Sequence, residues 1–126
     1  MIGLDTNVLV RYFTQDDAFQ AARANEIIDE LSEDEPGFVS VIVLAEIYWV
    51  LRESYKADRG TVVTILRGLL DSKEIVVERS ETARRALHHT EDGTDFADSL
   101  IVEFGIDAGC DHAVTFDQKA GIRLIT

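Results

Sequence analysis

The sequence contains a single cysteine and no long apolar run. One cysteine excludes an internal disulfide and any cysteine-rich metal site, and we interpret Cys110 as a small buried side chain. The longest apolar run, residues 41–45, is followed at once by Glu46, whereas a membrane span needs about 20 apolar residues. The N-terminus lacks the basic start and long apolar stretch of a signal peptide, so we expect a soluble, cytoplasmic protein.

The motifs of several common enzyme classes are also missing. No serine lies in a G-x-S-x-G context, so acyl transfer is weakly supported. There is no G-x-x-x-x-G-K-[ST] loop and no G-x-G-x-x-G, so nucleotide binding by those routes is unsupported. His88 and His89 are adjacent on a predicted helix and point about 100° apart, which makes them poor joint ligands for one metal. We interpret this pair as a solvated helix end.

Positive charge is scarce in this chain. Twenty-four acidic residues stand against 12 basic ones, for a net charge of −12. A broadly negative surface repels phosphate groups. The protein therefore either binds no nucleic acid or concentrates its acids in a metal site and on solvated faces, leaving a local basic rim. The bases are mostly arginine, the better bidentate phosphate ligand, and charge alone leaves both interpretations open.

Short apolar segments alternate with helical patterns along the 126 residues. This alternation favours an α/β fold with three layers, in which helices cover both faces of a short, mostly parallel sheet of four to five strands. We find no internal repeat and no linker, and expect a single domain over residues 1–126. The predicted strands are 2–4, 38–39, 75–77, 113–114 and 123–125. Ser40 and Ser80 are predicted to cap the helices that follow the second and third of these strands.

Four carboxylates fall at one end of this predicted sheet. Asp5 ends the first strand, and Asp117 ends the fourth. Glu46 lies in the second turn of the helix that follows the second strand, and Asp98 lies in the first turn of a helix that begins near Asp95. Ligands of open parallel sheets bind beyond the carboxyl ends of the strands. Carboxylates so close together would repel one another unless metal ions neutralised them.

Each acid also has an ordinary structural interpretation. Asp5 can be a turn residue or helix cap, Asp98 can favour the positive end of its helix, and Asp117 can cap a short turn. Glu46 interrupts an apolar stretch and can pair with a neighbouring arginine, which would offset the cost of burying its charge. The arginines considered for this pair are Arg11 and Arg52.

Oxygen ligands without cysteine favour Mg²⁺ or Mn²⁺. One or two such ions suit phosphodiester hydrolysis, because one ion activates water and a second, about 4 Å away, stabilises the leaving oxygen. A phosphoryl-transfer enzyme with Asp5 as nucleophile is an alternative. It is disfavoured because no acid lies two residues after Asp5, and only Lys119 among the lysines is near a predicted strand end.

Four segments occur in an order typical of one enzyme family. They are residues 4–12 (LDTNVLVRY), Ser40 followed six residues later by Glu46, residues 95–101 (DFADSLI), and residues 109–117 (GCDHAVTFD). Together they resemble the PIN-domain ribonucleases and, within them, the VapC toxins of VapBC toxin–antitoxin systems. The resemblance covers nearly the whole chain and implies a PIN-like fold.

This resemblance also implies the roles of particular residues. The metal-binding, catalytic set that it implies is Asp5, Glu46, Asp98 and Asp117. The supporting polar residues that it implies are Asn7, Ser40 and Thr115. Asp95 is a further candidate, although it lies one turn before Asp98 and can simply cap the helix.

The family resemblance further implies endonucleolytic cleavage of RNA, a homodimer, and dependence on Mg²⁺ or Mn²⁺. A VapB-type antitoxin would occupy the acidic groove with an arginine or lysine, and the net charge of −12 suits a basic antitoxin tail. DNA would be contacted only through the antitoxin, and no membrane association is expected. The alternative is a non-catalytic, PIN-like regulatory module that acts with its antitoxin.

Overall fold

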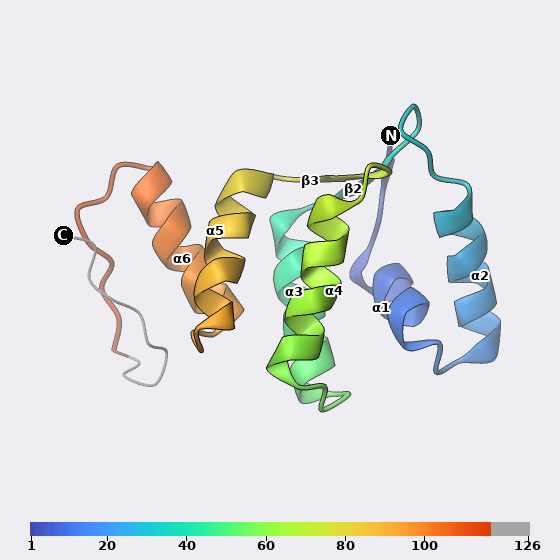
Figure 1. The fold of residues 1–126 in the computed structure, drawn as a ribbon, viewed down its shortest axis with the longest axis horizontal. Helices are drawn as coiled ribbons and strands as arrows, with labels where there is room; N and C mark the ends of the chain where they lie inside the picture. The colour runs from blue at the N-terminus through green and yellow to red at the C-terminus, as the bar shows by residue number, and fades with distance from the viewer. Residues whose placement is uncertain (117–126) are drawn as a thin grey trace. The chain divides into compact units, whose positions relative to one another are not determined.

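The computed structural model describes residues 1–116, which form two units, Met1–Glu78 and a second unit that begins at Arg79. Each unit is described by itself (Figure 1). The first unit consists of β1 (Ile2–Gly3), α1 (Thr6–Thr14), α2 (Ala18–Asp29), β2 (Gly37–Val39), α3 (Val41–Glu53), α4 (Arg59–Asp71) and β3 (Ile75–Val77). The second unit contains α5 (Ser80–Glu91) and α6 (Phe96–Asp107). The expectation of a single domain over residues 1–126 stays a prediction.

The three strands of the first unit form a parallel sheet in the order β1-β2-β3. Ile2 pairs with Gly37, and Gly37 in turn pairs with Ile75. A pair of helices connects each strand to the next, as parallel pairing requires, because the chain must return to the same edge before it pairs again. The prediction of an α/β fold with a short, mostly parallel sheet is confirmed.

Within residues 1–116, the sheet has fewer strands than the predicted four to five. In the part of the chain that the structure describes it has three, and the predicted strand at 113–114 is wrong, because residues 112–115 have no regular secondary structure. Val114 is 76% exposed and Phe116 fully exposed. A strand needs a neighbour to accept its backbone hydrogen bonds, and apolar β-branched residues alone do not supply one. The predicted strand at 123–125 lies outside the described residues.

The core of the first unit fills with side chains from β2 and its flanking helices. Leu9 on α1, Val39 on β2, and Leu44 and Ile47 on α3 are each at most 1% exposed. Full burial of such a side chain contributes roughly 1.5–3 kcal/mol relative to leaving it in water. Gly37 packs closely in this core: a Cβ at this position would lie 2.7 Å from Leu4 Cδ1, so the Leu4 side chain would have to shift.

Three helices of the first unit have an N-cap residue whose side chain accepts a hydrogen bond from a backbone N–H of the first turn. Ser40 Oγ accepts a hydrogen bond from the Val43 N–H at 3.3 Å, which confirms the predicted cap of α3. Asp17 and Asp58 act in the same way at α2 and α4. Such caps satisfy backbone N–H groups that the first helical turn leaves without partners.

The second unit begins differently from the prediction. Ser80 was predicted to cap α5, but Ser80 is the first helical residue, and Arg79 holds the N-cap position with a positive φ of 49°. Cys110 was predicted to be buried and is exposed. It follows Gly109, whose φ of 87° turns the chain away from the end of α6.

Two acidic side chains of α6 join that helix to α5. Glu103 is 5% exposed, accepts a hydrogen bond from Arg85 Nε at 2.9 Å, and lies 3.0 Å from His89 Nε2. Asp107 binds Arg85 Nη2 at 2.6 Å and also the Thr82 hydroxyl. That hydroxyl, and then the charge of Arg85, lower the pKa of Asp107 below its usual value. His89 is exposed as predicted, but its contact with Glu103 was not foreseen.

No helix in residues 1–116 combines the length and the apolar character that crossing a membrane would require.

Candidate functional site

Asp5 lies in the link between β1 and α1. The Leu4 N–H donates to the Phe38 carbonyl at 2.9 Å, which holds the end of β1 beside β2. Asp5 has an extended backbone and takes the N-cap position of α1, but its exposed side chain makes no capping hydrogen bond. The carboxylate therefore does not serve as a helix cap, and it faces solvent at the carboxyl end of a parallel strand.

Glu46 reaches the beginning of α1. It lies in the second turn of α3, and its Oε1 accepts a 2.7 Å hydrogen bond from the hydroxyl of Thr6. Thr6 directly follows Asp5 and is 7% exposed, so its side chain is fixed by its surroundings. This contact joins segments 40 residues apart and sets the Glu46 carboxylate beside the segment that carries Asp5.

The two arginines considered as partners of Glu46 make other contacts. Arg11 Nη1 binds Asp16 and the Tyr55 hydroxyl, each at 3.0 Å. Arg52 Nη1 donates to the Ala57 carbonyl at 3.1 Å. Glu46 itself is exposed, so no buried charge has to be neutralised there. Among residues 1–116 its hydrogen-bond partner is the neutral hydroxyl of Thr6, which leaves the charge of Glu46 for another ligand.

Asp98 belongs to the second unit. It lies in the first turn of α6, and its backbone N–H donates to Asp95 Oδ2 at 3.3 Å. Asp95 therefore caps the helix, in agreement with the simpler of its two interpretations. A carboxylate in the first turn also suits the partial positive charge of the helix N-terminus.

The complete set of four acids stays a prediction. Asp117 lies outside the described residues, and Asp98 lies in a different unit from Asp5 and Glu46. Among residues 1–116, no group of three or more histidine, cysteine, aspartate or glutamate side chains could hold a metal ion. Within the first unit, the hydrogen bond from Thr6 sets Glu46 beside the segment that carries Asp5. Thr115 is exposed in a segment without regular structure.

The donors at Asp5 and Glu46 fit a hard divalent cation. Both carboxylates are exposed, one is not used for capping, and the other has one oxygen oriented by a neutral donor. Mg²⁺ is commonly bound through one or two carboxylates, with waters completing its coordination. These two residues would hold such an ion, with Thr6 orienting Glu46.

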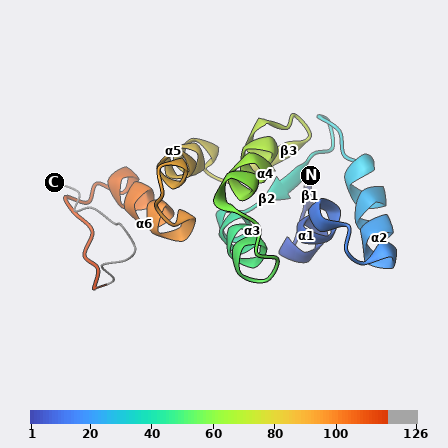
Figure 2. The ribbon, with the colours of Figure 1, turned by 60° about the horizontal axis from the view of Figure 1, so that its bottom comes forward.

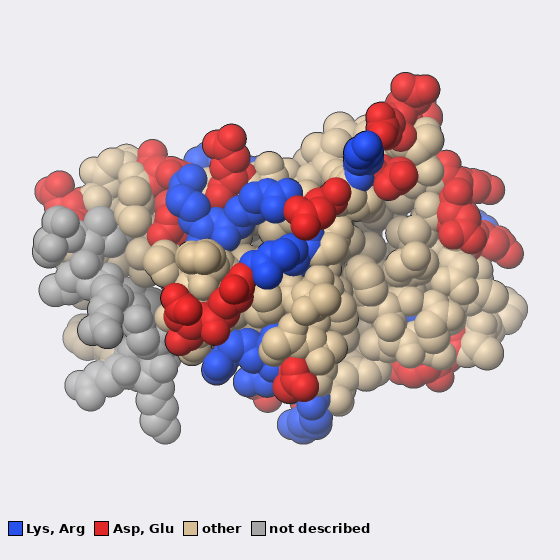
Figure 3. All heavy atoms as spheres, viewed as in Figure 1, with Lys and Arg blue, Asp and Glu red and all other residues tan. Residues whose placement is uncertain are grey.

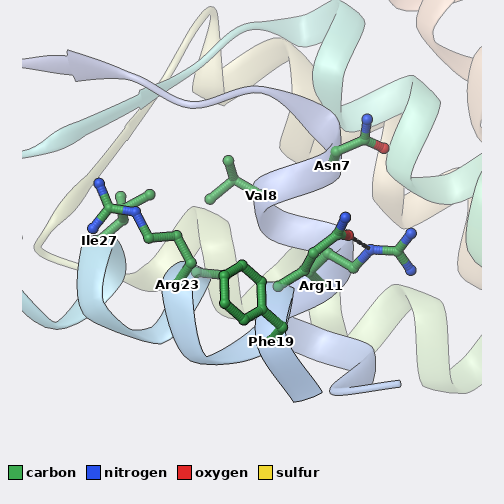
Figure 4. Close-up of a pocket in the computed structure, with 8 residues that line it drawn as sticks. Asn7, Val8, Arg11, Phe19, Arg23 and Ile27 are labelled. Carbon is green, nitrogen blue, oxygen red and sulfur yellow. Dashed lines mark hydrogen bonds between the residues drawn. The ribbon is translucent and has the colours of Figure 1, made fainter. Parts of the chain in front are cut away.

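A pocket of about 350 Å³ lies between α1 and α2. Figure 4 shows its lining, and the two helices run side by side in Figures 1 and 2. The residues that line it are Asn7, Val8, Arg11, Phe19, Gln20, Arg23, Ala24 and Ile27. Sequence reasoning missed this pocket and Thr6, although a hydroxyl residue directly after Asp5 was a visible signal.

Residues 2–122 match the family model described as PIN domain. The chain belongs to the PIN domain family. This confirms the resemblance that the four segments carry. The fold is also similar to that of a solved structure from Mycobacterium tuberculosis, VapC20, described as a toxin that cleaves the sarcin–ricin loop. The two share 19% identity and a TM-score of 0.50, over 98% of this chain and 97% of the other. No curated protein matches the sequence.

Proposed function

We propose that this PIN domain is a metal-dependent endoribonuclease of the VapC type, the toxin of a type II toxin–antitoxin pair. The observation that supports this most directly is the hydrogen bond from Thr6 to Glu46, because it sets Glu46 beside the segment that carries Asp5. In a member of the PIN family, two acids placed in this way would supply the first ligands of a metal site. The similarity to VapC20 supports the toxin class.

We assign the following roles to residues of this chain. Asp5 and Glu46 would hold a Mg²⁺ or Mn²⁺ ion, and the family resemblance adds Asp98 and Asp117 to this set. When bound, such an ion would supply Lewis-acid activation of water and charge stabilisation for phosphodiester hydrolysis. Thr6 fixes the position of Glu46. Supporting roles for Asn7, Ser40 and Thr115 rest on the family resemblance, and Ser40 contributes by starting the helix that carries Glu46.

The proposed partners follow from the same assignment. A VapB-type antitoxin would inhibit the enzyme by placing a basic side chain among the acids, to which the net charge of −12 attracts it. The toxin would form a homodimer, contact DNA only through the antitoxin, and act in the cytoplasm. RNA is the substrate, and the sarcin–ricin loop named for VapC20 is the first substrate to test.

Substitution of the acids tests the proposal. Purified, antitoxin-free protein is incubated with ribosomal RNA and with Mg²⁺ or Mn²⁺, and cleavage is followed on denaturing gels. We expect Asp5→Asn and Asp98→Asn to lower the cleavage rate by roughly 100-fold or more, because losing a ligand exceeds the effect of losing a residue that only orients one. Circular dichroism confirms that the variants fold.

Glu33→Gln is the matched control, since Glu33 is an exposed acid in the loop before β2. Its cleavage rate should equal that of the wild type. Full activity of Asp5→Asn with bound metal would refute the assignment.

A non-catalytic regulatory module acting with the antitoxin is the second candidate. The net charge of −12 favours it, because a strongly acidic protein repels RNA. Absence of cleavage of any RNA tried, with either metal and with folded protein, would favour this candidate.

A further inference from the structure

We propose that the pocket between α1 and α2 binds an unpaired nucleobase of the RNA substrate, with the ring of Phe19 as the stacking surface. This inference rests on the proposed ribonuclease function and names a substrate subsite for it. It begins from an exposed aromatic side chain: Phe19 is 84% exposed on α2, at the edge of the pocket. A ring so exposed has little value for folding, whereas it can stack on a base.

The lining of the pocket combines an apolar interior with a polar rim. Val8, Ala24 and Ile27 supply aliphatic surface, and Ala24 is 3% exposed. Figure 4 shows Phe19 and Arg23 on α2 across from Val8 on α1. A flat heterocycle offers two apolar faces and a polar edge, so it suits a site of this composition.

Two amide side chains border the same pocket. Gln20 Oε1 accepts a 2.6 Å hydrogen bond from Arg11 Nε, and the contact of Arg11 with Asp16 fixes that guanidinium in turn. Because its oxygen is held, the Gln20 amide is oriented and has N–H donors to offer. Asn7 supplies both a donor and an acceptor. Amide groups of this kind hydrogen bond to the edges of unstacked bases.

Charge favours RNA over a basic partner at this place. The chain has twice as many acids as bases, yet no carboxylate lines the pocket, and two arginines do. Arg23 pairs with Glu26 at 3.0 Å, but the two side chains are 70% and 65% exposed. Exposed pairs of this kind contribute little and exchange readily, so Arg23 can turn to a phosphate.

The position of the pocket connects it to the two acids. Asn7 directly follows Thr6, whose hydroxyl binds Glu46, and it lies two residues after Asp5. The first turn of α1, whose N-cap is Asp5, therefore forms part of the wall of the pocket. A base held there would place the adjoining phosphodiester near the carboxylates of this unit.

Binding measured without metal separates this subsite from catalysis. The probe is a short single-stranded RNA carrying 2-aminopurine, whose fluorescence falls when the base stacks, and EDTA prevents cleavage. We expect wild-type protein to quench the probe. Phe19→Leu keeps an apolar side chain without an aromatic ring, and should lose the quenching and weaken binding about tenfold.

Trp49→Leu is the matched control, because Trp49 is an aromatic residue of α3 that is 62% exposed outside the pocket. It should quench the probe and bind RNA as the wild type does. Arg23→Gln should reduce the slope of log affinity against log salt concentration by roughly the amount that one phosphate contact contributes. Lys73→Gln makes the same charge change away from the pocket and should leave this slope unchanged.

The outcomes distinguish failure of this inference from failure of the proposed function. Cleavage by the wild type together with unchanged RNA affinity and quenching in Phe19→Leu would overturn the nucleobase site and make a protein segment the occupant to test. If quenching is lost in Phe19→Leu alone, but the wild-type protein cleaves no RNA with either metal, the nucleobase site is supported and the proposed nuclease activity is rejected. Equal loss in Phe19→Leu and Trp49→Leu would also overturn the inference, because binding would then not depend on the pocket.

Discussion

Replacing Thr6 by valine removes one hydroxyl and little else. Thr6 is 7% exposed, and its Oγ1 donates to Glu46 Oε1 at 2.7 Å. Threonine and valine are both β-branched and of similar size, so α1 should begin as before. Because Glu46 is exposed, water can replace the lost donor, and we expect the free energy of unfolding to fall by less than about 1.5 kcal/mol.

The effect of Thr6→Val on metal binding should be larger than its effect on stability. A residue that orients a ligand typically contributes 10- to 100-fold to metal affinity, or about 1.4–2.8 kcal/mol. We expect isothermal titration calorimetry with Mn²⁺ to show a loss in this range, and the RNA cleavage rate at limiting metal to fall with it. Thr6→Ser keeps the hydroxyl and is the matched control.

Two results would refute this reasoning. If Thr6→Val binds Mn²⁺ as the wild type does while Asp5→Asn does not, then Thr6 has no part in the metal site. If Thr6→Ser loses as much affinity as Thr6→Val, the loss does not follow from the hydroxyl, because serine keeps it. Urea unfolding of each variant identifies any general loss of structure.

Two further predictions concern stability. Hydrogen bonds from the hydroxyls of Tyr55 and Thr14, and then from Arg11, lower the pKa of Asp16 to about 2. A lowered pKa stabilises the fold above the ordinary value near 3.8, and this contribution is lost as pH falls towards 2, so the difference in urea midpoint between wild type and Asp16→Asn should shrink over that interval. An undiminished difference at pH 2 would contradict this. Leu66 on α4 is completely buried, and Leu66→Ala should lower the free energy of unfolding by about 2–5 kcal/mol, measured by urea denaturation; a loss below 1 kcal/mol would show that the site collapses around the smaller side chain.

Features that depend on neighbours in the chain were predictable from the sequence. Ser40 before an apolar helical pattern predicts an N-cap, and the cap forms. The β-branched run at 75–77 predicts a strand, and β3 spans these residues. The spacing from Ser40 to Glu46 places the acid in the second turn of α3, and this too is observed. In each case the deciding interaction lies within about one helical turn or one strand.

Features that depend on distant partners were predicted poorly. Val114 has the character of a strand residue, yet strand formation needs a partner that local pattern does not reveal. The bond from Thr6 to Glu46 spans 40 residues, and the choice of a hydroxyl over an arginine as the partner of Glu46 follows only from how α1 meets α3. The left-handed backbone at Arg79 is likewise invisible in the sequence, since glycine is the usual residue there.

The net charge of −12 is weak evidence against RNA binding once the acids are located. Asp17, Asp58 and Asp95 cap helices, where their charge offsets a helix dipole and satisfies backbone N–H groups. Others gather over the loop that joins α2 to β2, on the surface shown in Figure 3. The pocket between α1 and α2 contains none. Screening at physiological salt limits exposed charges to about 8 Å, so an RNA strand at the pocket would respond to the arginines that line it more than to the total charge. If the arginines of the pocket dominate, RNA affinity should fall steeply as the salt concentration rises, and Arg23→Gln should make this fall less steep. If repulsion by the net charge of the chain dominates, RNA affinity should instead rise with the salt concentration.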